Sequence, residues 1–418
     1  MAVLFYNIIL FFFRSGIFLA SWFHPKARKW RAGRVGLLEG LEKIIPAGEK
    51  IIWIHCASLG EFEQGRPVME ELKKKFPAYR LLLSFFSPSG YESKKDYSGA
   101  DWVIYLPLDG PITARRFLDI VHPSLVIFVK YEFWYYYLKK IKYRKIPLIL
   151  ISALFRKDMS FFKWYGGLQQ KMLSRFDQLF VQNASSLELL KGIGLGDISS
   201  LSGDTRFDRV MEIASNATDL PLIENFLGQR SCLVAGSTWP EDEEVLAASW
   251  QQMDQPEFVL IIAPHEISSK HIQTLKKNFA GALLYSELPQ QSSLKASVLI
   301  IDNVGMLSTL YKYGRLAFVG GGFRKMGVHN VLEPAVYSQP VVFGPFYQKY
   351  QEAIGLVEAG GGTVVQNGDQ LSSFIKELLR DPSMYEKISL AAGEFVRSHA
   401  GATKKIIDHI QEKRLLTN

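Results

Sequence analysis

Two acidic residues in the first half of the chain follow short apolar runs that are typical of buried strands. Glu61 comes after the run 51–54 through the segment HCASLGE, and Glu132 comes after the run 124–129. In open α/β sheets the carboxyl ends of the strands line the crevice where ligands bind, and a carboxylate there can serve as a general base. For either acid alone, an exposed loop charge is the competing interpretation. Two acids at equivalent strand ends, with the basic neighbours Lys130 and Arg156, favour a catalytic site.

A second chemical pattern is the stretch LAFVGGGFRKMGVHNVLEP, residues 316–334. Its apolar run ends in Gly320–Gly322, where the backbone can turn tightly and approach a phosphate. Asn330 is the expected N-cap of a helix whose N-terminus attracts anions, and Glu333 is expected to accept hydrogen bonds from ribose hydroxyls. A Gly-rich turn can also be purely structural, but such a turn would not need these polar groups. We therefore expect a nucleotide site here.

These residues require a scaffold in which strands and helices alternate. An amphipathic helix is expected near residues 66–76, after Glu61, and the alternation of strands and helices continues to the end of the chain. It predicts an α/β protein with two doubly wound, Rossmann-like domains that face each other across a cleft. The runs expected to form strands are 51–54, 80–86, 124–129, 146–152, 178–182, 232–235, 258–263, 298–301, 316–319 and 340–343.

The N-terminal segment is almost wholly apolar and aromatic. Residues 2–23 approach the length that spans a bilayer, although Arg14 lies in the middle. The basic flank that follows, KARKWRAGR at 26–34, places the next domain on the cytoplasmic side, whether the segment spans the membrane or lies in its interface. A helix buried against the protein itself is the alternative.

Composition limits the possible partners and metals. The chain has 418 residues and a net charge of +8, which suggests an anionic partner: nucleic acid, acidic lipid or a phosphorylated small molecule. Its two cysteines, Cys56 and Cys232, are far apart and lack metal-type spacing, so neither a disulfide framework nor a zinc site is indicated. A reducing, cytosolic setting fits best.

Several motifs together resemble the 3-deoxy-D-manno-octulosonic acid (Kdo) transferases of lipopolysaccharide assembly. The resemblance covers nearly the whole chain, through HCASLGE, SPSG, YEFW, GDTRFD, FVGG and HNVLEP. It implies a GT-B glycosyltransferase that moves Kdo from CMP-Kdo to a lipid A precursor, lipid IVA, with inversion and without a metal or other cofactor. It also implies a location on the cytoplasmic side of the inner membrane and no nucleic-acid partner.

The resemblance also assigns roles to residues by position. Glu61 matches the general base, and Glu132 and Arg206 match positions that stabilise the transition state. Arg206 stands where Lys is common, which changes its hydrogen-bond geometry, and Met306 stands where many members have Glu, so its contact is expected through the backbone. The implied CMP contacts are Pro264, His265, Val304, Gly305, Met306, Asn330, Val331, Leu332 and Glu333.

The expected domains are a membrane anchor at 1–24, an acceptor-binding domain at 25–212 and a nucleotide-sugar-binding domain at 213–418, whose last helix packs back on the first domain. Two other functions remain open. One is a GT-B enzyme that uses a UDP-sugar, either a transferase or an epimerase. The other is a non-catalytic, membrane-tethered nucleotide-binding protein.

Overall fold

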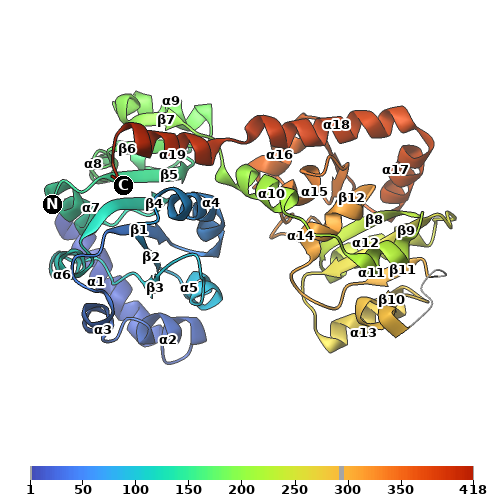
Figure 1. Cartoon of the computed structure of the whole chain (residues 1–418), viewed down its shortest axis with the longest axis horizontal. Coiled ribbons are helices and arrows are strands. Elements are labelled where there is room, and N and C mark those ends of the chain that lie inside the picture. Colours follow the sequence, from blue (N-terminus) through green and yellow to red (C-terminus); the bar gives the residue numbers. More distant parts are fainter. Residues whose placement is uncertain (1, 291–295, 418) are drawn as a thin grey trace. The chain divides into compact units, whose positions relative to one another are not determined.

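The computed structural model describes residues 2–290 and 296–417. The chain divides into two compact units (Figure 1). Unit 1 comprises Met1–Arg209 and Gly401–Asn418, and unit 2 comprises Val210–Ala400.

Unit 1 is built on a parallel sheet of seven strands among the residues described. Its central strands consist of buried aliphatic and aromatic residues, as expected for strands covered by helices on both faces. In spatial order the strands are β3 (Trp102–Tyr105), β2 (Arg80–Phe85), β1 (Ile51–Cys56), β4 (Pro123–Val129), β5 (Leu148–Ala153), β6 (Gln178–Val181) and β7 (Ser199–Leu201).

Helices cover both faces of this sheet, and one of them comes from the far end of the sequence. Helix α19 (Ala402–Glu412) contacts α4 and buries Ile406, Ile407 and Ile410 in the same core cluster as Phe62. The other helices of unit 1 are α1 (Ala2–Ala20), α2 (Pro25–Ala32), α3 (Leu37–Ile44), α4 (Leu59–Lys75), α5 (Pro88–Lys94), α6 (Pro111–Val121), α7 (Tyr135–Tyr143), α8 (Gly167–Leu173) and α9 (Ala184–Gly192), with the start of α10 (Thr205–Ser215).

Unit 2 repeats the architecture with a second parallel sheet. Its strands, in spatial order, are β10 (Leu283–Leu284), β11 (Val298–Ile300), β9 (Phe258–Pro264), β8 (Ser231–Thr238), β12 (Leu316–Val319), β13 (Val341–Phe343) and β14 (Gly362–Val364). Its helices, besides the end of α10, are α11 (Pro221–Leu227), α12 (Pro240–Trp250), α13 (Ser269–Asn278), α14 (Leu307–Leu310), α15 (Leu332–Ala335), α16 (Gln351–Glu358), α17 (Gly368–Arg380) and α18 (Pro382–His399).

The prediction of two α/β sheets of alternating strands and helices is confirmed, and all ten predicted strands are present. Four further strands, β3, β7, β10 and β14, were missed. Each is two to four residues long and lies at or next to a sheet edge, where the apolar signal is weakest.

The predicted helix at 66–76 was placed too late. Helix α4 begins at Leu59 and continues through Pro67, so Glu61 lies in its first turn and not in a loop. Two glycines and a proline in the first nine residues of this segment, 59–67, weakened the helical pattern: Gly60 and Gly65 lower the helix propensity, and Pro67 suggests a break.

Helix α1 is long and apolar enough to cross a membrane by length and composition. It nevertheless contacts the body of unit 1. Tyr6 donates a hydrogen bond of 2.7 Å to Asp109, and Tyr136 donates one of 2.9 Å to Asn7. Further along, the ring of Phe13 packs against Trp30 at a centroid distance of 5.7 Å.

Candidate active site

Glu61 lies at the carboxyl edge of the unit 1 sheet, just after β1, and only 8% of its surface is exposed. Its carboxylate accepts a hydrogen bond from the backbone N–H of Ala57. Burial, together with the nearby carboxylate of Glu132, raises the pKa of Glu61 to about 7, against the opposing effect of that hydrogen bond. A carboxyl group with a pKa near neutrality is suited to accepting a proton at physiological pH.

The same geometry gives Glu61 a structural role. Ser58 is the N-cap of α4, so Glu61 occupies the third helical position, from which acidic side chains reach back to the free N–H groups at a helix start. The bond from Ala57 is of this type. The two roles are compatible, because a carboxylate has two oxygens and several acceptor sites.

Glu132 is held by a chain of buried polar groups that begins inside the sheet. Its Oε2 lies 3.0 Å from Nε2 of His55 and accepts a 2.6 Å bond from the indole of Trp134. The other ring nitrogen of His55 lies 2.9 Å from the hydroxyl of Ser84, which accepts a 2.7 Å bond from Trp53. Because His55 and Ser84 are fully buried, their positions are determined by packing, and they orient Glu132 in turn.

The backbone also contributes to placing Glu132. Strand β4 ends at Val129, and Lys130 adopts a left-handed conformation with φ of 67°. This conformation costs about 1 kcal/mol for a residue with a Cβ, and such outliers cluster at functional sites. The left-handed conformation of Lys130 lies in a turn at residues 130–131, directly before Glu132. The charge of Lys130 is close enough to lower the pKa of Glu61, opposing the effect of burial.

Arg206 is connected to the same helix as Glu61. It donates two hydrogen bonds, of 2.9 and 2.7 Å, to Oδ2 of Asp204. Asp204 in turn accepts from Gln64 at 3.4 Å, and Thr205 donates to the carbonyl of Gln64. Gln64 lies three residues after Glu61, on the same face of α4. Unit 1 therefore brings the three predicted catalytic residues to one edge of its sheet.

In unit 2 the dominant feature is a stack of three rings. The rings of Trp239 and His329 lie side by side, and His265, which follows Pro264 at the end of β9, stacks on both, with centroid distances of 4.5 and 4.6 Å. The Trp239 indole donates a 2.9 Å hydrogen bond to Nε2 of His329. An indole N–H can only donate, so Nε2 must be unprotonated and His329 is neutral. Burial, followed by the electrostatic effects of His265 and Arg324, accordingly lowers the pKa of His329 to about 4.

The glycines of 320–322 have a different role from the one predicted. The N–H of Gly320 donates to the carbonyl of Gly236, and the N–H of Gly321 donates to Asp242, so these two amides already have partners within the protein. A Cβ on Gly322 would lie 2.4 Å from the backbone nitrogen of Gly344. The glycines are therefore needed where two backbone segments touch, and the predicted phosphate cradle of glycine amides is not supported.

Asn330 was predicted to be a helix N-cap, which is wrong in detail. Helix α15 has only four residues and its N-cap is Val331. Asn330 nevertheless accepts a 3.2 Å bond from the N–H of Leu332 and donates a 3.0 Å bond to Glu333. Val331 and Leu332 are buried, which leaves the half-buried Glu333 as the charged group of this motif.

The remaining predicted nucleotide contacts form the loop between β11 and α14. Val304 is 85% exposed, Gly305 has a φ of 96°, and Met306 is the N-cap of α14. These features suit contacts made by the backbone. Among the described residues, no group of three or more His, Cys, Asp or Glu side chains could hold a metal ion.

Sequence reasoning missed several residues that support these groups. His55 stands in the HCASLGE motif, but its hydrogen-bond partners become evident only when β1 is paired with β2 and β4. Gln64 would have been found had α4 been predicted to begin at Leu59. Trp239 and Asp242 follow β8 at the carboxyl end of the sheet, which is the position that revealed Glu61 and Glu132.

Known proteins resemble this chain over most of its length. A family description, 3-Deoxy-D-manno-octulosonic-acid transferase (kdotransferase), matches residues 29–209. The 3-deoxy-D-manno-octulosonic acid transferase of Aquifex aeolicus (strain VF5) is 30% identical over 334 residues, covering 78% of this chain and 86% of that protein. The transferase of the same name from Haemophilus influenzae is 27% identical over 401 residues, covering 92% of this chain and 91% of that protein.

Solved structures show the fold. The UDP-GlcNAc 2-epimerase from Neisseria meningitidis bound to UDP-GlcNAc has a TM-score of 0.60 at 16% identity, covering 87% of this chain and 100% of that one. MurG from Acinetobacter baumannii has a TM-score of 0.55 at 12% identity, covering 87% and 99%. The architecture is thus of the GT-B type, which several enzyme families share. It is the similarity of sequence, extending through both units to relatives of one name, that assigns this chain to the 3-deoxy-D-manno-octulosonic acid transferase family of glycosyltransferases.

Proposed function

We propose that this protein transfers Kdo from CMP-Kdo to a phosphorylated, acylated glucosamine disaccharide, the lipid A precursor lipid IVA, with inversion at the anomeric carbon and without a metal. Family membership supports the transferred sugar and the class of reaction. The mechanism rests on one observation: the carboxylate of Glu61 is buried just after the end of β1, and its pKa is raised to about 7.

In this mechanism Glu61 removes the proton of the acceptor hydroxyl as its oxygen attacks the anomeric carbon from the face opposite CMP. The bond between that carbon and the CMP phosphate oxygen breaks, and CMP leaves with the electron pair. Arg206, whose guanidinium is oriented by Asp204, supplies positive charge to the developing anion. Glu132, held by His55 and Trp134, stabilises positive charge that develops on the sugar.

In unit 2, the CMP contacts proposed are Pro264, His265, the loop of Val304, Gly305 and Met306, and the segment from Asn330 to Glu333. The carboxylate of Glu333 accepts hydrogen bonds from the ribose hydroxyls. The stacked rings of Trp239, His265 and His329 supply a rigid wall, in which the imidazole of His329 is neutral.

A product assay tests this function. Purified protein is incubated with CMP-Kdo and a tetra-acylated lipid A precursor, and the product is weighed by mass spectrometry. We expect the mass of the acceptor to rise by that of one or more Kdo residues, with release of CMP. Binding competition between CMP and UDP separates the proposal from a UDP-sugar enzyme of the same fold. Preference for UDP, with no Kdo product, would refute it.

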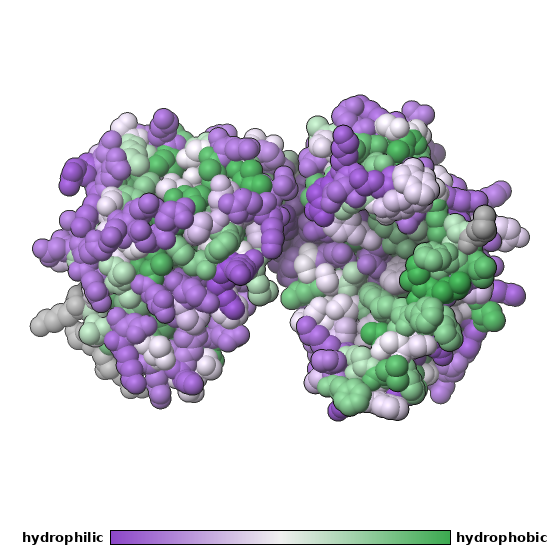
Figure 2. All heavy atoms as spheres, turned by 180° about the vertical axis from the view of Figure 1, so that it is seen from behind, coloured by the Kyte–Doolittle hydropathy of each residue, from purple (hydrophilic) through white to green (hydrophobic). Residues whose placement is uncertain are grey.

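We also propose that the protein works on the cytoplasmic surface of the inner membrane with α1 lying in the interface and not crossing the bilayer. The contacts of Tyr6 and Phe13 with unit 1 hold the helix against a folded domain along several turns. Its opposite face is apolar and exposed: Phe5 and Phe12 are 66% and 67% exposed. Figure 2 shows apolar side chains gathered in this region of unit 1. Such a helix binds by burying one face.

Point substitutions test the membrane surface without removing the contacts of α1 with unit 1. The double variant Phe5→Glu, Phe12→Glu should move the protein from the membrane to the soluble fraction. Trp164→Glu is the matched control, because Trp164 is an aromatic residue that is 96% exposed and lies outside α1. Membrane recovery of the double variant equal to that of the control would contradict an interfacial α1.

A further inference from the structure

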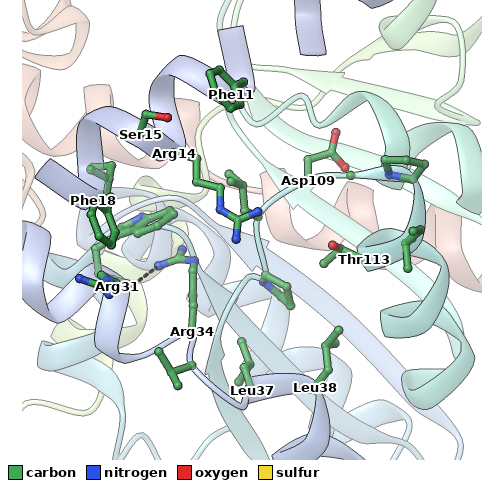
Figure 3. A pocket seen from close by; sticks show the side chains of 18 of the residues that line it. Phe11, Arg14, Ser15, Phe18, Arg31, Arg34, Leu37, Leu38, Asp109 and Thr113 are labelled. Atoms are coloured by element: carbon green, nitrogen blue, oxygen red, sulfur yellow. Dashed lines mark hydrogen bonds between the residues drawn. The ribbon is translucent and has the colours of Figure 1, made fainter. Parts of the chain in front are cut away.

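A cavity of about 1010 Å³ lies beside α1, entirely within unit 1. Phe11 and Phe18 of α1 line one side, Asp109 and Thr113 line another, and Leu38 of α3 lines the base (Figure 3). Most of the lining is apolar. The volume is at the upper end of the range of small-molecule sites in proteins, which is roughly 300–1,000 Å³. None of the predicted catalytic or CMP-binding residues lines this cavity.

The charged groups of the cavity are predominantly positive. Arg14, Arg31 and Arg34 line it, together with the acids Asp109 and Glu39. The two acids are engaged elsewhere: Asp109 accepts bonds from Tyr6 and from the backbone of α7, and Glu39 accepts from Arg116 at 3.1 Å. The arginines therefore give the cavity an electrostatic preference for an anion.

All three arginines carry charge without an acidic partner among the described residues, and Arg31 donates a hydrogen bond of 3.4 Å to the hydroxyl of Ser21. Arg14 makes no hydrogen bond or ion pair with any residue that the structure describes. Arg34 donates to the backbone carbonyls of Leu106 and Phe86, each at 2.8 Å, and lies 3.8 Å from the ring centre of Trp30. Burial lowers the pKa of Arg34 to about 9, which is still above neutrality, so its charge persists.

The surroundings of the cavity indicate a lipid environment. The side chains of Phe11 and Leu19 that border it are 66% and 57% exposed, and they belong to the helix that is apolar enough for a membrane. Val35 and Ile112, on the other sides, are 77% and 74% exposed. Exposed apolar groups around a basic cavity match an amphiphile that has both an acyl chain and an anionic head group.

We propose that this cavity binds one anionic phospholipid of the bilayer, with an acyl chain between α1 and the base at Leu38 and the phosphate beside Arg14 and Arg31. The lipid is a resident component and not the acceptor substrate. The bound lipid would stabilise the packing of α1 against the rest of unit 1. This proposal concerns binding alone, so it can be tested without turnover and fails or holds independently of the proposed transfer reaction.

Native mass spectrometry of the full-length protein in a neutral detergent provides the test. The protein is offered equal amounts of phosphatidylglycerol and phosphatidylcholine with identical chains. We expect one phosphatidylglycerol to be retained in preference to phosphatidylcholine. Arg14→Ala should reduce that retention by about fivefold, from the usual strength of one basic residue near an anionic lipid surface. Equal retention of the two lipids by the parent protein would overturn the proposal.

Two variants separate a cavity from a diffuse positive surface. Arg28→Ala removes the same charge from the neighbouring basic segment, 26–34, but Arg28 lies outside the cavity, so this variant should retain the parent preference. Leu38→Trp keeps all charges and narrows the base, so it should lower retention, with melting temperature measured to verify folding. Equal losses for Arg14→Ala and Arg28→Ala, or full retention by a folded Leu38→Trp protein, would contradict a cavity site.

A competition experiment tests whether the cavity binds a resident phospholipid or the acceptor. The tetra-acylated lipid A precursor is added to protein that already carries phosphatidylglycerol. A resident lipid should remain bound while the precursor adds to the complex. Stoichiometric displacement of phosphatidylglycerol by the precursor would show that the cavity belongs to the acceptor and would overturn the proposal.

Discussion

The two units carry candidate half-sites at equivalent places in similar sheets, but they are built from different chemical groups. The half-site of unit 1 consists of ionisable side chains, with Glu61 raised to a pKa of about 7 and Glu132 held by buried donors. That of unit 2 presents stacked rings, with His329 kept neutral. Proton transfer requires a group whose charge changes near neutral pH, whereas nucleotide binding requires a constant shape. One fold thus provides local environments that suit both proposed tasks through a few residues.

The largest effect that would sharpen this comparison is expected at Glu61. Glu61→Gln keeps an oxygen that can accept from Ala57 but removes the basicity, so turnover should fall by roughly 100- to 10,000-fold. CMP affinity and melting temperature should remain close to those of the parent. Product formation, calorimetry with CMP and thermal unfolding are measured on the same variant. A folded variant with near-normal turnover would exclude Glu61 as the base.

Glycine substitutions test whether unit 2 depends on close backbone contacts. Gly322→Ala places a Cβ 2.4 Å from a backbone atom of Gly344 and should destabilise the protein by about 1–3 kcal/mol or more. Gly60→Ala is the matched change beside Glu61: nothing lies within 4 Å of the added Cβ, and alanine favours a helix. Denaturant unfolding should therefore show a lower free energy of unfolding for Gly322→Ala and not for Gly60→Ala. Equal stabilities would remove the contrast between the two half-sites.

Glu333→Ala examines the charged group of the donor motif. It should weaken CMP binding by about 1–3 kcal/mol, the usual penalty for losing a hydrogen bond to a charged group. Isothermal calorimetry with CMP measures the change, and the unfolding midpoint serves as the control for folding. Unchanged affinity would place the ribose elsewhere.

The pH dependence should distinguish the two half-sites. With a pKa of about 7 for Glu61, the fraction in the basic form rises about tenfold from pH 6 to pH 8, and turnover should follow. CMP affinity between pH 7 and 8.5 should vary little, because His329, with a pKa of about 4, stays neutral. Turnover that is flat from pH 6 to pH 8 under conditions where chemistry limits the rate would contradict the assignment of Glu61.

The same shifts predict opposite contributions to stability. Between pH 4.5 and about 7 the folded protein binds more protons at Glu61 than the unfolded chain does, so this contribution falls as pH rises. Between about pH 4 and 6.5 the folded protein binds fewer protons at His329, so its contribution is lost as pH falls through that window. Comparing the unfolding free energy of Glu61→Gln with that of the parent across pH 5–7 isolates the contribution of Glu61 to the pH dependence of stability.

Strand order along the chain could be predicted because buried parallel strands are continuous apolar runs, as 124–129 and 258–263 show. The positions of Glu61 and Glu132 followed from the ends of those runs. The partners of these acids could not be predicted, because they depend on registers between strands: His55 meets Ser84 only once β1 is paired with β2. The close backbone contact that requires glycine at position 322 likewise depends on a non-local neighbour, Gly344.

The path of the chain through unit 1 affects the order in which the protein can fold during synthesis. The core cluster that includes Phe62 is completed by Ile406, Ile407 and Ile410, which emerge from the ribosome only after all of unit 2. Asp208 accepts hydrogen bonds from the N–H groups of Gly401 and Thr403 at the start of α19 and so must also await this segment. Unit 2 can fold while it is being made, whereas the unit that carries the proposed catalytic carboxylates is finished last, after α1 has already been available to the membrane.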